Sequence, residues 1–301
     1  MKKEKFVDFH NHSKKSDGNL SYDALIEKAI QNDIGVFAVT DHNELMEAEE
    51  FERLQKKYEG QIQLVQGVEL SILYDTSKKG QKEIHTVILF KNPEKLKFLA
   101  TRKMDRRGYV NAIRDALAEV GVKIPDYDEL EAVYPETAHL GRKHIADWMH
   151  KNGVVDSVDA AFDIYIGGFG EKRAFVDSAP FRSGYGGLET LCEVRKEGGD
   201  SILAIILAHP FYYNLDEAEL QKLIFDFKGA AGLLGGMEVL YRRYNDAQRA
   251  ELAALADRFG LVYSAGSDYH GQSETDGLDN QFPMEIWEKI EENYKRCFEE
   301  A

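Results

Sequence analysis

The chain has 301 residues, of which 43% are hydrophobic and 30% charged, the balance of an ordinary globular protein. Its 53 acidic against 38 basic residues give a net charge of -15, which argues against long duplex nucleic acid as a partner. We expect a cytoplasmic protein with no membrane partner, because the sequence shows no signal peptide, no apolar run of roughly 18 residues, and cysteines only at Cys192 and Cys297.

The first part of the chain alternates strand and helix patterns. Ser21 is placed to cap the first helix, which the apolar spacing predicts to end near Gly35. A charged helix is predicted over residues 44–58. Short apolar runs predict strands over residues 6–9, 36–39, 62–68 and 86–90.

The same alternation returns after residue 200. The continuous apolar run 202–207 predicts a strand buried on both faces. Strands are predicted over 236–240 and 261–265, and helices over 216–227, 246–259 and 284–298. Repeated strand–helix units predict a mostly parallel sheet, and the number of short strands favours a barrel over an open sheet.

The region from 92 to 199 breaks this rhythm. It is mainly helical in pattern and contains a Gly- and aromatic-rich loop, IGGFGEKRAF, at 166–175. We therefore expect residues 1–91 and 200–301 to form the barrel and residues 92–199 to form a mainly helical insertion subdomain.

Histidine and carboxylate side chains recur just after the predicted strands. His10 and His12 form an H-x-H pair whose members face the same side of an extended segment. His85 is the exception, because it begins its predicted strand. In β/α barrels the carboxyl ends of the strands carry the active site. The candidate metal ligands are His10, His12, Asp17, His42, Glu69, His85, His209, Asp268 and His270.

Imidazole mixed with carboxylate suits Zn²⁺, Mn²⁺ or Fe²⁺. One ion takes about four protein ligands, so this set predicts two or three divalent ions that share a bridging carboxylate. Closely spaced ions can hold a phosphoryl group and lower the pKa of water between them. The alternative interpretation is a series of separate hydrogen bonds at strand ends.

Six segments resemble the PHP (polymerase and histidinol phosphatase) domain superfamily. They are DFHNHSKKSDG, VTDHN, GVELS, IHTVILF, AHP and GSDYH, in that order from residue 8 to residue 270. The segment GRKHIA at 141–146 is similar to one in stand-alone PHP phosphoesterases that act on nucleoside monophosphates, 3′,5′-bisphosphonucleosides or short RNA ends. The resemblance implies a distorted (β/α)7 barrel with a trinuclear metal site.

The resemblance also implies how the ligands are shared. One ion would take His10, His12, Glu69 and Asp268, a second Glu69, His85 and His209, and a third Asp17, His42 and His270. Glu69 would then bridge the first two ions. Asp41, beside a ligand, is expected to orient an imidazole.

In the insertion, the resemblance suggests that Arg142 and His144 face the active site and act in catalysis. The planar guanidinium of Arg142 suits a phosphate. Lys172 and Arg173 are further candidates for binding substrate phosphate. Their loop reads GEKRAFV, without the proline of the resembling proteins, which predicts a different substrate pocket.

The function expected from these residues is hydrolysis of a phosphomonoester of a small phosphorylated molecule, with a nucleotide favoured. A metal-bridging hydroxide would attack phosphorus. The alternatives are histidinol-phosphate phosphatase, a 5′-3′ exonuclease on short RNA, and a non-catalytic metal-binding module. The last would predict missing ligands, whereas all the ligand positions of the motif are filled here. The oligomeric state is left open.

Overall fold

One sheet organises the molecule. Its strand order is β1-β2-β3-β4-β7-β8-β9. The strands are β1 Phe6–Asp8, β2 Ile34–Val39, β3 Gln63–Thr76, β4 Gly80–Phe90, β7 Ile202–Leu207, β8 Gly235–Tyr241 and β9 Val262–Gly266. Neighbours are parallel, except that β4 runs antiparallel to both β3 and β7. The computed structural model describes residues 5–76, 80–101, 103–135, 137, 140–168, 171–183, 186–271 and 277–298.

The two edges of this sheet meet just beyond β1 and β9. The Phe9 N–H donates to the Ala265 carbonyl at 3.0 Å, and the Asp268 N–H donates to the His10 carbonyl at 2.9 Å. A parallel bridge joins Asn11 to Tyr269. These contacts between the two edges extend over fewer residues than a regular strand ladder, so the barrel is distorted. The predicted distorted (β/α)7 barrel is confirmed.

Strands β3 and β4 extend well beyond the predicted ranges 62–68 and 86–90. They pair as a long antiparallel ribbon, from Gln66 opposite Phe90 to Thr76 opposite Gly80. Because the two strands satisfy each other's backbone hydrogen bonds, they continue beyond the short apolar runs from which they were predicted. His85 consequently lies within β4 and not at its start. Because β4 is reversed, its first half lies at the carboxyl end of its parallel neighbours, which explains the exception noted in the sequence.

Helices cover the outside of the barrel. They are α1 Tyr22–Gln31, α2 Ala48–Lys57, α7 Glu189–Gly198, α8 Glu217–Ala231, α9 Asp246–Phe259 and α10 Glu285–Phe298. Ser21 caps α1, accepting from the Ala24 N–H at 3.3 Å. Helix α2 begins later than predicted because the preceding backbone is held elsewhere: the Asn43 N–H donates to the Glu69 carbonyl at 2.9 Å.

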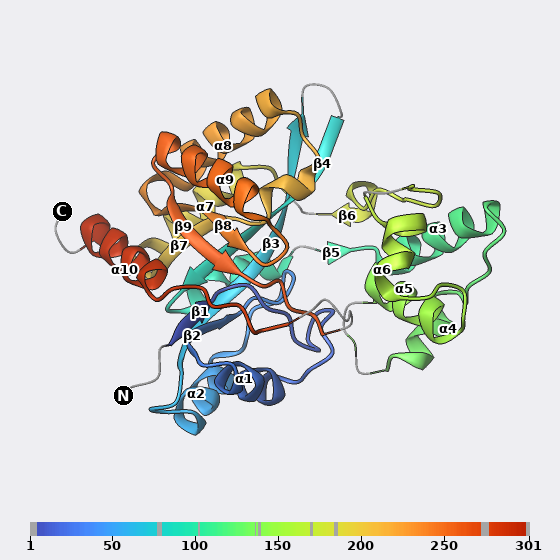
Figure 1. Ribbon diagram of the computed structural model, residues 1–301, viewed down its shortest axis with the longest axis horizontal. Coiled ribbons are helices and arrows are strands. Elements are labelled where there is room, and N and C mark those ends of the chain that lie inside the picture. The colour runs from blue at the N-terminus through green and yellow to red at the C-terminus, as the bar shows by residue number, and fades with distance from the viewer. Residues whose placement is uncertain are drawn as a thin grey trace.

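The barrel interior is filled by apolar side chains from alternate positions of the strands, among them Val65, Val87 and Leu89. Helix α10 packs Ile286 and Ile290 onto this interior cluster. In Figure 1, α10 lies at the end of the barrel remote from the insertion. The opposite end of the barrel is therefore the end that faces the insertion.

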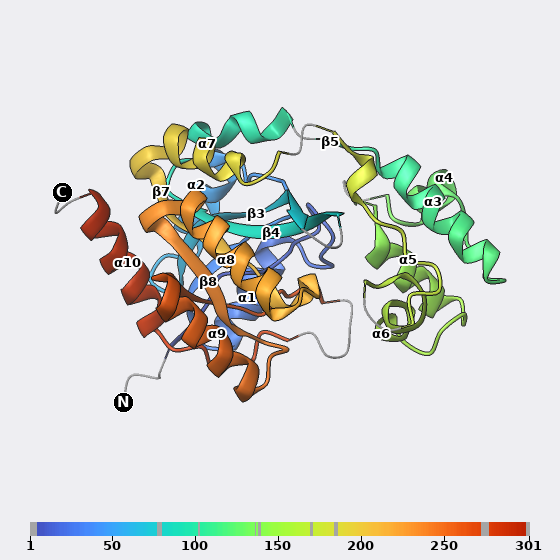
Figure 2. The same ribbon diagram turned by 90° about the horizontal axis from the view of Figure 1, so that it is seen from above.

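The insertion forms a lobe beside the barrel (Figures 1 and 2). It contains α3 Arg106–Glu119, α4 Tyr127–Val133, α5 Arg142–Lys151 and α6 Val158–Ala161, and it is joined to the barrel through the antiparallel pair β5 Lys103–Met104 and β6 Arg182–Ser183. Its apolar side chains form a cluster of their own, which includes Ile113, Leu117 and Ile145.

The ends of the predicted insertion pack with the barrel. Leu96, in the 3₁₀ helix Pro93–Thr101, and Leu191, in α7, belong to a second apolar cluster, which also contains residues of the barrel strands β3 and β7. We therefore propose that the inserted unit runs from β5 to β6 and is shorter than the predicted 92–199. Within the described residues, no helix combines the length and apolar character needed to cross a membrane.

Candidate metal centre

Strand alternation carries two of the predicted ligands into the mouth of the barrel. Glu69 follows Val65 on the same face of β3, and His85 precedes Val87 and Leu89 on the same face of β4. Val65, Val87 and Leu89 fill the interior. The polar side chains therefore continue the interior column at the end where the apolar packing stops, and Glu69 is fully buried.

The Glu69 carboxylate is surrounded by imidazoles. Oε1 lies 3.2 Å from His10 Nε2, 2.8 Å from His85 Nδ1 and 3.1 Å from His209 Nε2. Oε2 lies 3.3 Å from His12 Nε2 and 2.7 Å from His42 Nδ1. One carboxylate thus touches histidines from separate segments of the chain.

Two aspartates extend the cluster on the side of His12 and His270. Asp268 Oδ1 lies 3.2 Å from His12 Nε2 and 3.5 Å from His270 Nδ1. Asp17 Oδ1 lies 3.1 Å from His270 Nε2, and Asp17 Oδ2 lies 3.7 Å from His42 Nε2. The structure therefore brings together every metal ligand predicted from the sequence.

The donor atoms suit divalent cations. Buried atoms that have no hydrogen-bond partner among the described residues include His10 Nε2, His12 Nε2, Glu69 Oε2, His85 Nδ1 and His270 Nε2. Buried lone pairs that face one another are unfavourable unless a cation lies among them. Three overlapping groups have ligand atoms within 4.8 Å of one another: His12, Asp17, His42 and His270; His10, His12 and Glu69; and His42, Glu69 and His85.

Two of the candidate ligands have strained backbones. His209 has φ of 28° and Asp268 has φ of 52°, in the left-handed region that non-glycine residues seldom occupy. Such strain persists where the surroundings fix it and is frequent at functional sites. The His209 N–H donates to Glu238 Oε2 at 2.7 Å. Glu238 Oε1 lies 3.1 Å from His10 Nδ1, so Glu238 orients a ligand from within the barrel.

The carboxylates change the protonation of the histidines. Burial by itself lowers the pKa of His12, but the nearby carboxylates of Asp268 and Glu69 outweigh it and raise the pKa to about 9. Burial is likewise outweighed at His85, where Glu69 and Glu83 raise the pKa to about 10. At His42 burial prevails and lowers the pKa to about 4. Without metal, His12 and His85 are therefore protonated at pH 7.

The role expected for Asp41 is wrong in its detail. Its carboxylate accepts from the Ser13 N–H at 2.8 Å, from the Ser13 hydroxyl at 2.7 Å and from the Ser16 hydroxyl at 2.6 Å. Among the described residues, its link to an imidazole runs through Ser16, whose Oγ lies 3.5 Å from His12 Nδ1. Asp41 therefore holds the loop after His12, because Ser13 and Ser16 donate hydrogen bonds to its carboxylate.

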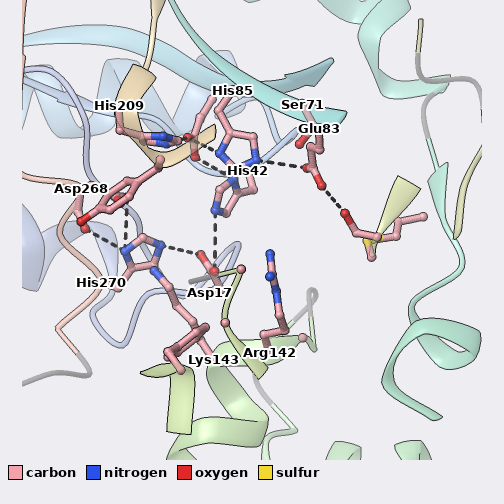
Figure 3. Close-up of a pocket in the computed structure, with 18 of the residues that line it drawn as sticks. Asp17, His42, Ser71, Glu83, His85, Arg142, Lys143, His209, Asp268 and His270 are labelled. Carbon is pink, nitrogen blue, oxygen red and sulfur yellow. Dashed lines mark hydrogen bonds and ion pairs between the residues drawn. The ribbon is translucent and has the colours of Figure 1, made fainter. Parts of the chain in front are cut away.

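A cavity of about 440 Å³ opens over the cluster, between the barrel and the insertion. Asp17, His42, Glu69 and Asp268 lie on its barrel wall, and Arg142 and Lys143 lie on the wall formed by α5. Figure 3 shows Arg142 extending toward Asp17 and His42, and Lys143 beside His270. The cavity thus places the cluster of carboxylates and imidazoles opposite the two cations of α5.

The other residues predicted to act on substrate lie elsewhere. His144 is buried at the start of α5, where its Nδ1 accepts from the Gly141 N–H at 3.3 Å, and it lines a separate cavity of about 480 Å³. Burial lowers the pKa of His144 to about 4. This placement fits a structural role, so we do not assign His144 to catalysis.

Lys172 and Arg173 do not line the cavity over the cluster. Arg173 pairs with Glu171 at 2.5 Å, and Lys172 Nζ lies 5.9 Å from the centre of the Phe175 ring. Sequence reasoning instead missed other cavity-lining cations, namely Arg106, Lys143, Arg182 and Arg243. Of these four residues, Lys143 could have been predicted from the sequence, because it lies inside the motif GRKHIA.

Comparison with known proteins gives consistent matches. The family model of the PHP domain matches residues 8–135. A 5′-3′ exoribonuclease of Haemophilus influenzae is 33% identical over 298 residues, which are 95% of this chain and 99% of that protein. A 3′,5′-nucleoside bisphosphate phosphatase of Chromobacterium violaceum is 27% identical over 276 residues, which are 89% of this chain and 88% of that protein.

Solved structures share the fold. One, from Bifidobacterium adolescentis, is of a protein described as a metal-dependent phosphoesterase; it has a TM-score of 0.71 and 22% identity, covering 96% of both chains. Another, an amidohydrolase from Chromobacterium violaceum, has a TM-score of 0.71 and 24% identity, covering 95% of this chain and 96% of that one. At this level of identity the likeness extends to the fold.

Binding of metal should release protons. His12 and His85 carry protons at pH 7, because their pKa values of about 9 and 10 lie above that pH. The pKa of His10 is also raised well above its usual value, because Glu69, Glu238 and Asp268 outweigh burial. A ligand nitrogen must lose its proton, so Mn²⁺ binding that uses these three histidines should release roughly three protons, and affinity should rise about tenfold per pH unit for each proton displaced. Titration calorimetry at pH 6, 7 and 8 in buffers of different ionisation enthalpy measures both quantities. Proton-neutral binding would contradict the arrangement.

Proposed function

This chain belongs to the PHP domain family of metal-dependent phosphoesterases, and we propose that it hydrolyses a phosphomonoester of a nucleotide at the cluster around Glu69. The observation that supports the proposal is the pairing of that cluster with cationic side chains across one cavity. A phosphoryl group placed between them would meet positive charge on both sides once the cluster holds metal. The expectation that the chain is an enzyme is confirmed by its family.

We assign the metal ligands as the sequence suggested, with Glu69 as the bridge between ions. Its two oxygens face different histidines: Oε1 faces His10, His85 and His209, and Oε2 faces His12 and His42. Divalent ions bound there supply Lewis acidity and lower the pKa of water at the site. Two or three ions of Mn²⁺, Zn²⁺ or Fe²⁺ fit the overlapping donor groups of the cluster.

The protein's own cations hold the substrate in this proposal. Arg142 can take two phosphoryl oxygens through its planar guanidinium, and Lys143 adds a point charge on the side of His270. Both residues begin α5, so one helix start places them together. The insertion forms one wall of the cavity, so a phosphoryl group bound there would lie partly out of bulk water, which strengthens each electrostatic contact.

A second candidate is removal of nucleotides from the 5′ end of short RNA. It is favoured by the Haemophilus influenzae exoribonuclease, because that similarity covers nearly the whole of both chains. The net charge of -15 is compatible with a short oligomer, which needs few phosphate contacts. Histidinol phosphate shares the phosphomonoester chemistry and is the third substrate to be compared.

A substrate panel tests these alternatives. With Mn²⁺ added, the protein should release phosphate from 3′,5′-bisphosphoadenosine and AMP faster than from histidinol phosphate. Release of mononucleotides from a 5′-phosphorylated oligoribonucleotide, followed by mass spectrometry, would support the second candidate. The control is the same protein treated with a chelator. Turnover of histidinol phosphate alone would refute the nucleotide proposal.

Removing the charge of Glu69 tests whether the cluster is one connected site. Glu69→Gln keeps the size of the side chain but loses the charge that offsets the cations, so more than one metal equivalent and nearly all turnover should be lost. Elemental analysis gives the metal content, and circular dichroism checks the fold. His42→Ala should retain more metal than Glu69→Gln. Full metal content in Glu69→Gln would show that Glu69 is a structural residue.

Two arginines of the insertion form a matched pair of variants. Arg142 lines the cavity, whereas Arg173 does not and pairs with Glu171. Loss of a charge-assisted contact in a desolvated site costs about 2–4 kcal/mol, so Arg142→Ala should lower kcat/KM roughly 30- to 1000-fold with metal content unchanged. Arg173→Ala should match the wild type. Equal kinetics for the two variants would exclude Arg142 from substrate binding.

A further inference from the structure

Glu83 is a largely buried carboxylate that the function described so far does not use. It lies on β4 two residues before His85, so both side chains project from the same face of the strand. Its side chain is 11% exposed, and its Oε1 lies 3.1 Å from His85 Nε2. The other ring nitrogen, His85 Nδ1, lies 2.8 Å from Glu69 Oε1. The imidazole of His85 is therefore held between two carboxylates.

The two carboxylates have different consequences for the ring. A nitrogen that binds metal offers a lone pair, so the proton of a neutral imidazole must reside on the other nitrogen. With Nδ1 directed at the cluster, the Nε2–H of His85 donates to Glu83. Such a carboxylate fixes both the tautomer and the orientation of the ring.

The insertion reaches Glu83 from the opposite side. The Ser178 hydroxyl donates to Glu83 Oε2, and the Arg182 guanidinium pairs with Oε1. Arg182 is in β6, and Ser178 precedes it in the segment by which the insertion returns to the barrel. The Arg182 side chain is only 10% exposed, so this ion pair is shielded from water. A group that contacts a ligand of the cluster is thus anchored by the insertion.

His10 provides a contrast within the same site. Its Nδ1 lies 3.1 Å from Glu238, a residue of barrel strand β8. That partner depends on the barrel alone. Glu83, in comparison, accepts from Ser178 and Arg182 of the return segment, so its position depends on how the insertion is seated.

We propose that Glu83 is a positioning residue for His85, and that Ser178 and Arg182 make the position of this ligand depend on the docking of the insertion. The inference rests on the proposed role of His85 as a metal ligand. The insertion would then have a second role besides contact with substrate. Docking of the return segment against the barrel would also place His85 where it can bind metal.

The test compares full-length variants by titration calorimetry with Mn²⁺. Loss of a carboxylate that orients a ligand typically weakens metal binding roughly 10- to 100-fold, which is the change expected for one class of sites in Glu83→Leu. Glu83→Gln should bind more tightly than Glu83→Leu, because the amide oxygen still accepts from Nε2–H. Ser178→Ala, which leaves Arg182 paired, should weaken Mn²⁺ binding several-fold. Glu171→Gln, in an exposed ion pair, should match the wild type.

A spectroscopic measurement distinguishes a change in the orientation of the His85 ring from a general loss of structure in the variants. In ¹⁵N-histidine spectra of the Zn²⁺-loaded protein, the signal missing from His85→Ala identifies His85. The wild type and Glu83→Gln should show its Nε2–H protected from exchange, and Glu83→Leu should lose that protection. Folded Glu83→Leu and Ser178→Ala proteins with wild-type Mn²⁺ affinity and an unchanged His85 signal would overturn the inference. Unchanged Mn²⁺ binding in His85→Ala would instead overturn the ligand assignment beneath it.

Discussion

The buried carboxylate of Glu69 is the constraint on which the site depends. A carboxylate in the mouth of a barrel is unfavourable unless cations or hydrogen-bond donors surround it. Here imidazoles supply that surrounding, and the pKa of Glu69 is well below its usual value, because His42, His85 and His10 together outweigh the effect of burial. The same crowding of donor atoms is what suits the site to divalent metal.

The reversal of β4 shapes the site as much as the ligand types do. If β4 were parallel to its neighbours, His85 would lie at the amino ends of the strands, away from Glu69. Antiparallel pairing places Glu69 opposite Val87. His85 precedes Val87 by two residues in β4 and therefore lies on the same face of the sheet, next to Glu69. The ribbon that results also carries Glu83 toward the insertion, linking the barrel with the return segment at β6.

The insertion resolves an electrostatic difficulty. A chain with a net charge of -15 repels phosphorylated molecules at long range, and the ligand cluster is itself rich in carboxylates. Metal reverses the field on the barrel side. On the opposite side, α5 brings Arg142 and Lys143 to the cavity wall. The cavity therefore becomes locally attractive to phosphate although the surface as a whole is acidic.

The sequence by itself determined the barrel class and predicted the candidate metal ligands that the structure brings together, because strand alternation and strand-end placement are local patterns that fix a side chain's face. It did not determine which residues of the insertion reach the site. Arg142 and His144 are neighbours on α5, yet they line different cavities, because residues around a helix point in different directions and only docking selects the side that faces the barrel. Glu83 escaped prediction for the same reason: its partners Ser178 and Arg182 are distant in the chain, and only the folded molecule brings them together.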